Sequence, residues 1–295
     1  ACMITNPHID LHTGGLSSGL ARAWDCFGPH LTPDQRAVWL RLLRRLLNLY
    51  LDTARAGQWN CTAIPNANPV CNGGGGLLAI ALLESFPAEA NEALYYARKY
   101  LWNWLDYCHG TEGGNTEGAQ YWQYGCENFL PFALALERLL GHDDGLLSHP
   151  AITHLMSMIE VGLTNDGGMH GLNDTVPLPV GGLLAWYAAS RHGDALGLWY
   201  GDHAQRLYRE RQARHLPTPY RALNSLAVWL RPEVPESFTQ PPLPTAMVQP
   251  DIAYGVLRSG SAWDCPLVAG MKGSRAPYTH HNQPDTGAIF LDLRG

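Results

Sequence analysis

The sequence predicts a mainly helical fold that is followed by a β part at its C-terminus. Segments with apolar residues at helical spacing recur between residues 37 and 230, six prolines interrupt residues 231–250, and short β-rich segments lie within residues 251–295. We therefore expect three parts: a helical domain over 1–230, a proline-rich linker over 231–250, and the start of an antiparallel β-sheet domain over 251–295. The last part is expected to be truncated.

Composition and charge exclude two classes of partner. The 295 residues are 46% hydrophobic, which is enough to bury a full core. A net charge of −6, from 26 acidic residues against 20 Lys plus Arg, leaves no basic footprint for nucleic acid. The apolar run 77–83 is too short to span a bilayer, and the segment that starts at Ala1 lacks the basic and apolar blocks of a signal peptide. We expect no nucleic-acid partner and no membrane span.

The seven cysteines predict neither a zinc ribbon nor a disulfide scaffold. They occupy positions 2, 26, 61, 71, 108, 126 and 265, and no two of them form a CxxC pair. Most are expected to be buried thiols.

The first helix is expected over residues 37–56. Thr32-Pro33-Asp34 is a typical start signal, a broad leucine face follows, and Gly57 provides the stop. Residues 58–76 are rich in Asn, Pro and Gly and are expected to form a loop, which leads into a second apolar helix over 77–86.

The same alternation of helix and polar loop continues along the chain. Further helices are expected over 88–108, 118–140, 150–163, 176–191, 194–212 and 220–230. A bundle has short, plain loops, whereas alternate loops here carry Asn, Gly and aromatic residues. The pattern therefore favours an incomplete α/α toroid.

The character of the chain changes after residue 230. Strands are expected over 252–258, 266–272 and 286–294, separated by Gly, Ser and Asp as in an antiparallel sheet. Three strands rarely form a stable unit, and the chain has no initiator Met. We expect a fragment of a longer protein, with strand 286–294 leaving an open edge through which chains associate.

The stretch Asn115-Thr-Glu-Gly-Ala-Gln-Tyr-Trp-Gln-Tyr-Gly125 resembles a site at the start of a helix. Thr116 can be the N-cap, and Glu117 suits the positive end of the helix. Glu117, Tyr121 and Tyr124 are then expected on one helix face, directed into a cleft. The alternative is that Tyr121, Trp122 and Tyr124 are packing residues, as aromatic residues on helices usually are.

Two further stretches are polar and crowded. Residues 66–74 precede a helix and contain Asn68 and Asn72, which can equally be capping and turn residues. Residues 278–287 precede a strand and contain His281, which can equally be a solvated loop histidine.

Together these stretches resemble the heparinase II/III-like polysaccharide lyases, which include oligoalginate lyases. The resemblance runs along nearly the whole chain and rests on five motifs in order. They are Asn68-Pro-Val-Cys-Asn-Gly-Gly74, followed by the apolar run 77–83; Glu117-Gly-x-x-Tyr-Trp-x-Tyr-Gly125; Gly171-Leu-Asn-Asp-Thr175; Asp251-Ile-Ala-Tyr-Gly-Val-Leu-Arg-Ser259; and His281-x-x-x-Asp285-x-Gly287.

The resemblance implies an α/α toroid followed by an antiparallel β-sheet domain, with substrate in the cleft between them. It also implies cleavage of uronate-containing polysaccharides by β-elimination, in which a base removes the proton on C5 and the glycosidic oxygen leaves from C4. Periplasmic or secreted location and an acidic polysaccharide partner, such as glycosaminoglycan or alginate, follow from the same resemblance.

Each candidate residue has a role in this chemistry. A phenol can protonate the leaving oxygen and, when deprotonated, accept a proton, so Tyr121 is the first candidate for acid and base, with Tyr124 in reserve. Asn72 is expected to neutralise the uronate carboxylate, and His281 is expected to be a base or a second carboxylate clamp. The expected substrate-binding residues are Asn68, Glu117, Trp122, Tyr124 and Trp59.

Two departures from the family pattern bear on cofactor and substrate. The structural zinc site of the family has a second His two residues after the first, and this position is Gln283, a poor zinc ligand. We expect no cofactor and no zinc there. The loops 58–76 and 109–124 contain no Arg or Lys, which favours an unsulfated or lightly sulfated uronate polymer over heparin.

Two other functions fit the same fold. The chain can be a non-catalytic carbohydrate-binding remnant. It can also be a glycoside hydrolase, which needs two carboxylates across the scissile bond, and Glu117 with Asp174 is the pair available for that reaction.

Overall fold

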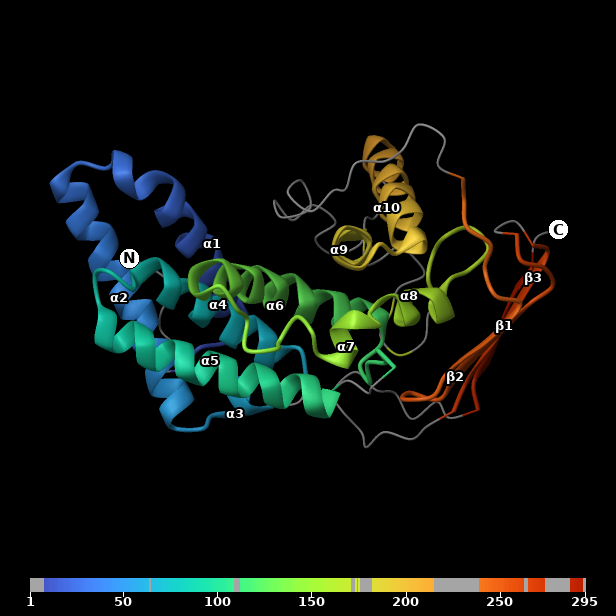
Figure 1. Cartoon of the computed structure of the whole chain (residues 1–295), viewed down its shortest axis with the longest axis horizontal. Helices are drawn as coiled ribbons and strands as arrows, with labels where there is room; N and C mark the ends of the chain where they lie inside the picture. Colours follow the sequence, from blue (N-terminus) through green and yellow to red (C-terminus); the bar gives the residue numbers. More distant parts are fainter. Residues whose placement is uncertain are drawn as a thin grey trace. The chain divides into compact units, whose positions relative to one another are not determined.

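The chain is mainly helical, with a four-stranded antiparallel sheet near its C-terminus (Figure 1). The computed structural model describes residues 8–63, 65–108, 112–170, 173, 175, 182–214, 239–262, 265–273 and 287–293. The chain divides into two compact units: Ala1–Tyr107 with Tyr124–Ser148, and Cys108–Gln123 with His149–Gly295. None of the helices in the described ranges is long and apolar enough to cross a membrane.

The first unit is built from helices. They are α1 (Leu11–Phe27), α2 (Pro33–Arg55), α3 (Trp59–Thr62), α4 (Ala67–Leu82), α5 (Pro87–Cys108) and most of α6 (Ala119–Leu140). A short 3₁₀ turn, Gly28–His30, joins α1 to α2. The expected helices over 37–56, 88–108 and 118–140 are confirmed as α2, α5 and α6.

Helix α2 begins where the sequence predicts. The Thr32 hydroxyl accepts from the Gln35 backbone N–H at 3.3 Å, and the Gln35 side chain accepts from the Thr32 backbone N–H at 3.0 Å. This capping box satisfies two backbone donors that a helix start otherwise leaves open. The buried face of the helix carries Leu43, Leu46, Leu47, Tyr50 and Leu51.

Helix α4 corrects the expectation of a loop over 58–76. The helix begins at Ala67 and includes the glycines at positions 73–76. A Cβ added to Gly74 would lie 2.1 Å from the Gly14 carbonyl oxygen, and one added to Gly75 would lie 2.5 Å from the Tyr50 ring. The glycines therefore allow neighbouring helices to approach α4 closely, although glycine lowers helix propensity.

Helix α1 was not expected from the sequence. Its small residues form a packing surface, because a Cβ added to Gly14 would lie 2.8 Å from the Val70 carbonyl oxygen on α4. The buried side chains of α1 include Ser17, Ser18 and Ala21, so the helix lacks the leucine face that identifies α2.

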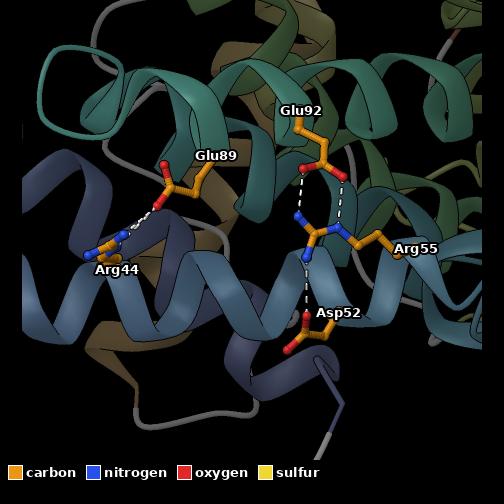
Figure 2. A network of polar contacts seen from close by, with 5 residues as sticks. All are labelled: Arg44, Asp52, Arg55, Glu89 and Glu92. Carbon is orange, nitrogen blue, oxygen red and sulfur yellow. Dashed lines mark hydrogen bonds and ion pairs between the residues drawn. The ribbon is translucent and has the colours of Figure 1, made fainter.

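Two exposed ion pairs, Arg44–Glu89 and Arg55–Glu92, connect α2 to α5, and a third, Arg55–Asp52, lies within α2 (Figure 2). Arg44 lies 2.6 Å from Glu89, and Arg55 lies 2.6 Å from Glu92 and 3.4 Å from Asp52. The hydrogen bond from Arg55 lowers the pKa of the Glu92 carboxyl. Because these pairs are exposed and screened by salt, they orient the two helices more than they stabilise them.

The second unit contains shorter helices and the sheet. The helices are α7 (Pro150–Thr153), α8 (Met156–Gly162), α9 (Gly182–His192) and α10 (Ala195–Ala213), and α9 packs against α10 (Figure 1). The expected helix over 150–163 is thus interrupted between α7 and α8. The Asp194 side chain caps α10 by accepting from the Gly197 N–H at 2.6 Å. The expected helix over 220–230 lies outside the described residues, as does 176–181.

The sheet has the strand order β1-β2-β3-β4, and all its pairs are antiparallel. Its strands are β1 (Ala246–Gln249), β2 (Tyr254–Arg258), β3 (Leu267–Lys272) and β4 (Ile289–Leu293). The three expected strands are confirmed as β2, β3 and β4. Strand β1 lies inside the expected linker 231–250. It was not predicted because it has only four residues and is flanked by prolines, which disfavour strands.

One face of the sheet packs against its own unit. Arg258 is buried and donates to the carbonyl oxygens of Glu160 at 2.7 Å and Leu163 at 3.3 Å, which ties β2 to α8. On the same face, a Cβ added to Gly270 would lie 1.7 Å from the Phe290 ring. Glycine at this position is therefore required for Phe290 to cross β3.

Candidate functional site

The loop 112–118 leads into helix α6 and is the centre of the candidate site. The Trp122 N–H donates to the Gly118 carbonyl at 3.0 Å, and Gly118 has φ +89, so Gly118 takes the N-cap position. The expectation that Thr116 caps the helix is wrong, because the helix begins at Ala119. Glu117 precedes the helix and is not one helical turn behind Tyr121. Its N–H instead donates to the Asn115 side chain at 2.9 Å.

Gln249 at the end of β1 and Asp251 between β1 and β2 hold the beginning of this loop. The Asp251 carboxylate accepts from the N–H groups of Glu112 at 2.8 Å and Gly114 at 3.3 Å. The Gln249 amide donates to the Glu112 carbonyl at 2.6 Å and to the Ser157 hydroxyl at 3.0 Å. A charged acceptor for two backbone donors makes this a strong attachment.

A buried lysine and an asparagine hold the end of the loop. Asn173 has φ +55, and its amide donates to the Thr116 carbonyl at 3.4 Å. The Lys272 ammonium donates to the Asn173 amide oxygen, and Lys272 is only 2% exposed. A Cβ added to Gly118 would lie 2.9 Å from the Thr175 hydroxyl. That hydroxyl is buried and has no hydrogen-bond partner among the described residues.

The contacts of the loop bring three of the five motifs together. The Asp251 motif contacts Glu112 and Gly114, and the Asn173 motif contacts Thr116 and lies beside Gly118, so both motifs contact the loop 112–118 whose last two residues begin the Glu117 motif. Lys272 is a further residue at this loop, and no motif in the sequence contains it. Strand alternation was the signal for it, since Lys272 follows Val268 and Gly270 on the inward face of β3.

Two tyrosines follow the loop on α6. Tyr121 and Tyr124 are half-buried and lie three residues apart, so they are on the same side of the helix, as the sequence predicts. Trp122 between them is 1% exposed, and its indole N–H has no hydrogen-bond partner in the described ranges. Glu117 is also 1% exposed. Neither Trp122 nor Glu117 therefore presents a surface to a sugar in this structure.

Asn68 and Asn72 lie in the first unit, inside a buried polar network. The Asn72 amide is directed at the Cys61 carbonyl at 2.9 Å and the Asn68 carbonyl at 3.0 Å, and its oxygen accepts from the Tyr50 hydroxyl at 2.9 Å. The Asn68 amide donates to the carbonyls of Ala63 at 2.9 Å and Tyr100 at 3.1 Å. Both asparagines are 0% exposed, so their donors are used inside the unit.

Burial controls the titration of this network. It raises the pKa of the Tyr50 phenol well above its usual value and that of the Cys61 thiol to about 12. Both groups therefore stay neutral near pH 7. Cys61, Cys71, Cys126 and Cys265 are buried free thiols, as expected, and Cys26 is an exposed one.

The remaining candidates are separated from these contacts or undescribed. Trp59 is 50% exposed on α3 of the first unit. His281, Gln283, Asp285 and Asp174 lie outside the described residues. In the part of the chain that the structure describes, no three His, Cys, Asp or Glu side chains are grouped to hold a metal ion.

Comparison with known proteins adds no support to the resemblance to the lyase family, which depends on the five sequence motifs alone. Neither the family models nor the characterised proteins that were compared with this chain match it.

Proposed function

We propose that the chain is a polysaccharide lyase that cleaves a uronic-acid-containing polysaccharide by β-elimination. The observation that supports this proposal most is that the Asn173 and Asp251 motifs both contact the loop 112–118, which leads into the Glu117 motif. All three motifs resemble motifs of one lyase family. Their meeting at one loop, one helical turn before Tyr121, is expected if they serve one site.

The reaction requires two proton transfers and neutralisation of a carboxylate. A base takes the C5 proton, the electron pair forms the C4–C5 double bond, and the C4–O bond breaks. The departing oxygen then takes a proton from an acid, so no water is consumed. Tyr121 is the proposed acid, and as a phenolate it can also be the base; Tyr124 is the reserve.

Charge on the enolate-like intermediate must be balanced by fixed donors. His281 is the proposed donor from the β part. Asn72 can contribute only in a conformation that releases its amide from Cys61 and Asn68. Lys272 adds a positive charge behind Asn173, and we assign it the role of positioning the loop that precedes Tyr121.

The proposed substrate is an unsulfated or lightly sulfated uronate polymer, and the proposed location of the protein is periplasmic or extracellular. No cofactor is part of the proposed reaction. The absence of Arg and Lys from residues 109–124 supports the choice of an unsulfated or lightly sulfated polymer, because sulfate groups are usually bound by Arg and Lys.

Ultraviolet absorbance tests the proposal directly. The chain is incubated with alginate, hyaluronan, chondroitin and heparin, and both absorbance of the new C4–C5 double bond and reducing ends are followed. We expect absorbance and reducing ends to rise together on an unsulfated polymer. New reducing ends without absorbance would show a hydrolase, and saturable binding with neither signal would show a binding protein.

A further inference from the structure

The outward face of the sheet is apolar across all four strands. Its large side chains are exposed to between 36% and 69%: Val248 on β1, Leu257 on β2, Leu267 and Met271 on β3, and Ile289, Leu291 and Leu293 on β4. The register places Met271 opposite Ile289 and Leu267 opposite Leu293, and Ala269 lies opposite Leu291. The exposed residues therefore form one continuous surface, which we call the outer apolar face.

Buried and exposed residues alternate along the strands, yet the exposed residues are apolar, unlike those on the solvent-facing side of most antiparallel sheets. In β3, Val268, Gly270 and Lys272 are buried toward the unit, while Leu267 and Met271 are exposed. An antiparallel sheet with one side in water normally carries polar residues on that side. Here none of the described residues on the outer apolar face is charged. The sheet has the residue pattern of one that is covered on both sides.

We propose that a second copy of this chain covers the outer apolar face, sheet against sheet. The exposed parts of the seven large side chains amount to roughly 800 Å², which is about what each partner contributes to a standard stable interface. A patch of this size also exceeds the few hundred square ångströms that monomers commonly expose.

The face is suited to pairing with itself. In a two-fold contact the same patch is used by both copies, so a charge near the axis would meet its own like charge. The outer apolar face avoids this, although the chain as a whole carries a charge of −6. Two such sheets can pack about 10 Å apart with interdigitated side chains, as in a β-sandwich.

The molar mass in solution tests the proposal. Sedimentation equilibrium and light scattering of the full chain are expected to show a concentration-dependent dimer. Leu257→Lys and Met271→Lys each place a charge in the middle of the contact, so each is expected to weaken dimerisation by at least about a hundredfold. Both residues lie on interior strands, whose backbone is already paired on both sides. Their substitution therefore cannot act through an open strand edge.

Leu42→Lys is the matched control, because Leu42 is 41% exposed on α2 of the first unit. It is expected to leave the dimer intact, and circular dichroism and melting confirm that each variant is folded. If one sheet variant does not fold, the other gives the same test. The proposal is overturned by a parent chain that stays monomeric at all concentrations. It is equally overturned by an assembly that persists in both folded sheet variants, which would point to pairing at the edges of β1 and β4.

Discussion

The Tyr50 hydroxyl donates to the Asn72 amide oxygen at 2.9 Å in the interior of the first unit. This contact connects α2 to α4, and the same amide is directed at the carbonyls of Cys61 and Asn68. A side chain expected to clamp a substrate carboxylate thus satisfies backbone groups of its own fold. The structural role and the clamping role predict different results for the same substitution.

If Asn72 is structural, Asn72→Ala leaves several buried polar groups unsatisfied. We expect its free energy of unfolding, measured by urea denaturation, to fall by about 2–4 kcal/mol, and that of Tyr50→Phe to fall by about 1–2 kcal/mol. An Asn72→Ala protein with parental stability and abolished turnover would instead show that Asn72 acts on the substrate.

Tyr121→Phe separates a catalytic phenol from a packing aromatic. The substitution keeps the ring and removes the hydroxyl, so the melting temperature is expected to stay close to the parent's. General acid or base catalysis contributes about a hundredfold to ten-thousandfold, and turnover is expected to fall by that order while KM changes little. Tyr124→Phe is the matched control and is expected to lose less. A folded Tyr121→Phe protein with parental turnover, beside an inactive Tyr124→Phe, would transfer the role to Tyr124.

Lys272→Met tests the positioning role of the buried lysine. Methionine fills similar space but cannot donate to Asn173, so the loop 112–118 loses part of its support. We expect turnover to fall about tenfold or more, since small misplacements of catalytic groups have large effects. Lys99→Met, at an exposed position on α5, is the control. Unchanged turnover in Lys272→Met would remove the lysine from the proposed site.

Acid sensitivity is predicted from His170. Burial lowers the pKa of His170 to about 3, with a smaller contribution from Arg258, while Asp166 acts in the opposite direction. The unfolded chain binds a proton at His170 near the ordinary pKa of 6.5, whereas the folded chain does so only near pH 3. Neutral His170 therefore contributes fully to the stability of the folded chain above pH 6.5, and this contribution is lost as the pH falls from 6.5 toward 3.

At pH 5, His170 is expected to account for about 2 kcal/mol of lost stability. The measurement compares the free energies of unfolding of the parent and His170→Gln at pH 7.5 and pH 5. We expect the parent to lose more stability than the variant over this interval. Equal losses in both proteins would mean that His170 is accessible to protons in the folded chain.

Gly74→Ala tests whether the glycine run of α4 is needed for packing. A Cβ there would lie 2.1 Å from a backbone oxygen of α1, which cannot move aside alone, so we expect destabilisation of about 3 kcal/mol or more. Gly19→Ala on α1 is the control, because nothing lies within 4 Å of its added Cβ. That variant is expected to be slightly stabilised by better helix propensity. Equal effects of the two substitutions would contradict the packing role.

The sequence alone identified the elements whose signals are local. Helix α2 carries its cap, its apolar face and its terminal glycine within one continuous segment, and β3 carries its own alternation. Such signals need no knowledge of distant residues, because capping and periodicity act over a few residues. The pairing of Tyr121 with Tyr124 on one side of α6 was predicted in the same way.

Only the tertiary structure determined which residues lie next to the α4 glycines, Asn72 and Lys272. The glycines at 73–76 resemble a loop in sequence, but they lie in helix α4, where Gly14 and Tyr50 of neighbouring helices approach so closely that no side chain would fit. Asn72 resembles a ligand residue, and it is buried because Tyr50 and Cys61 bond to it. Lys272 contacts the candidate site through Asn173, about a hundred residues earlier in the chain. Contacts between residues so far apart in sequence produce no local pattern in a single sequence. They could therefore be identified only from the tertiary structure.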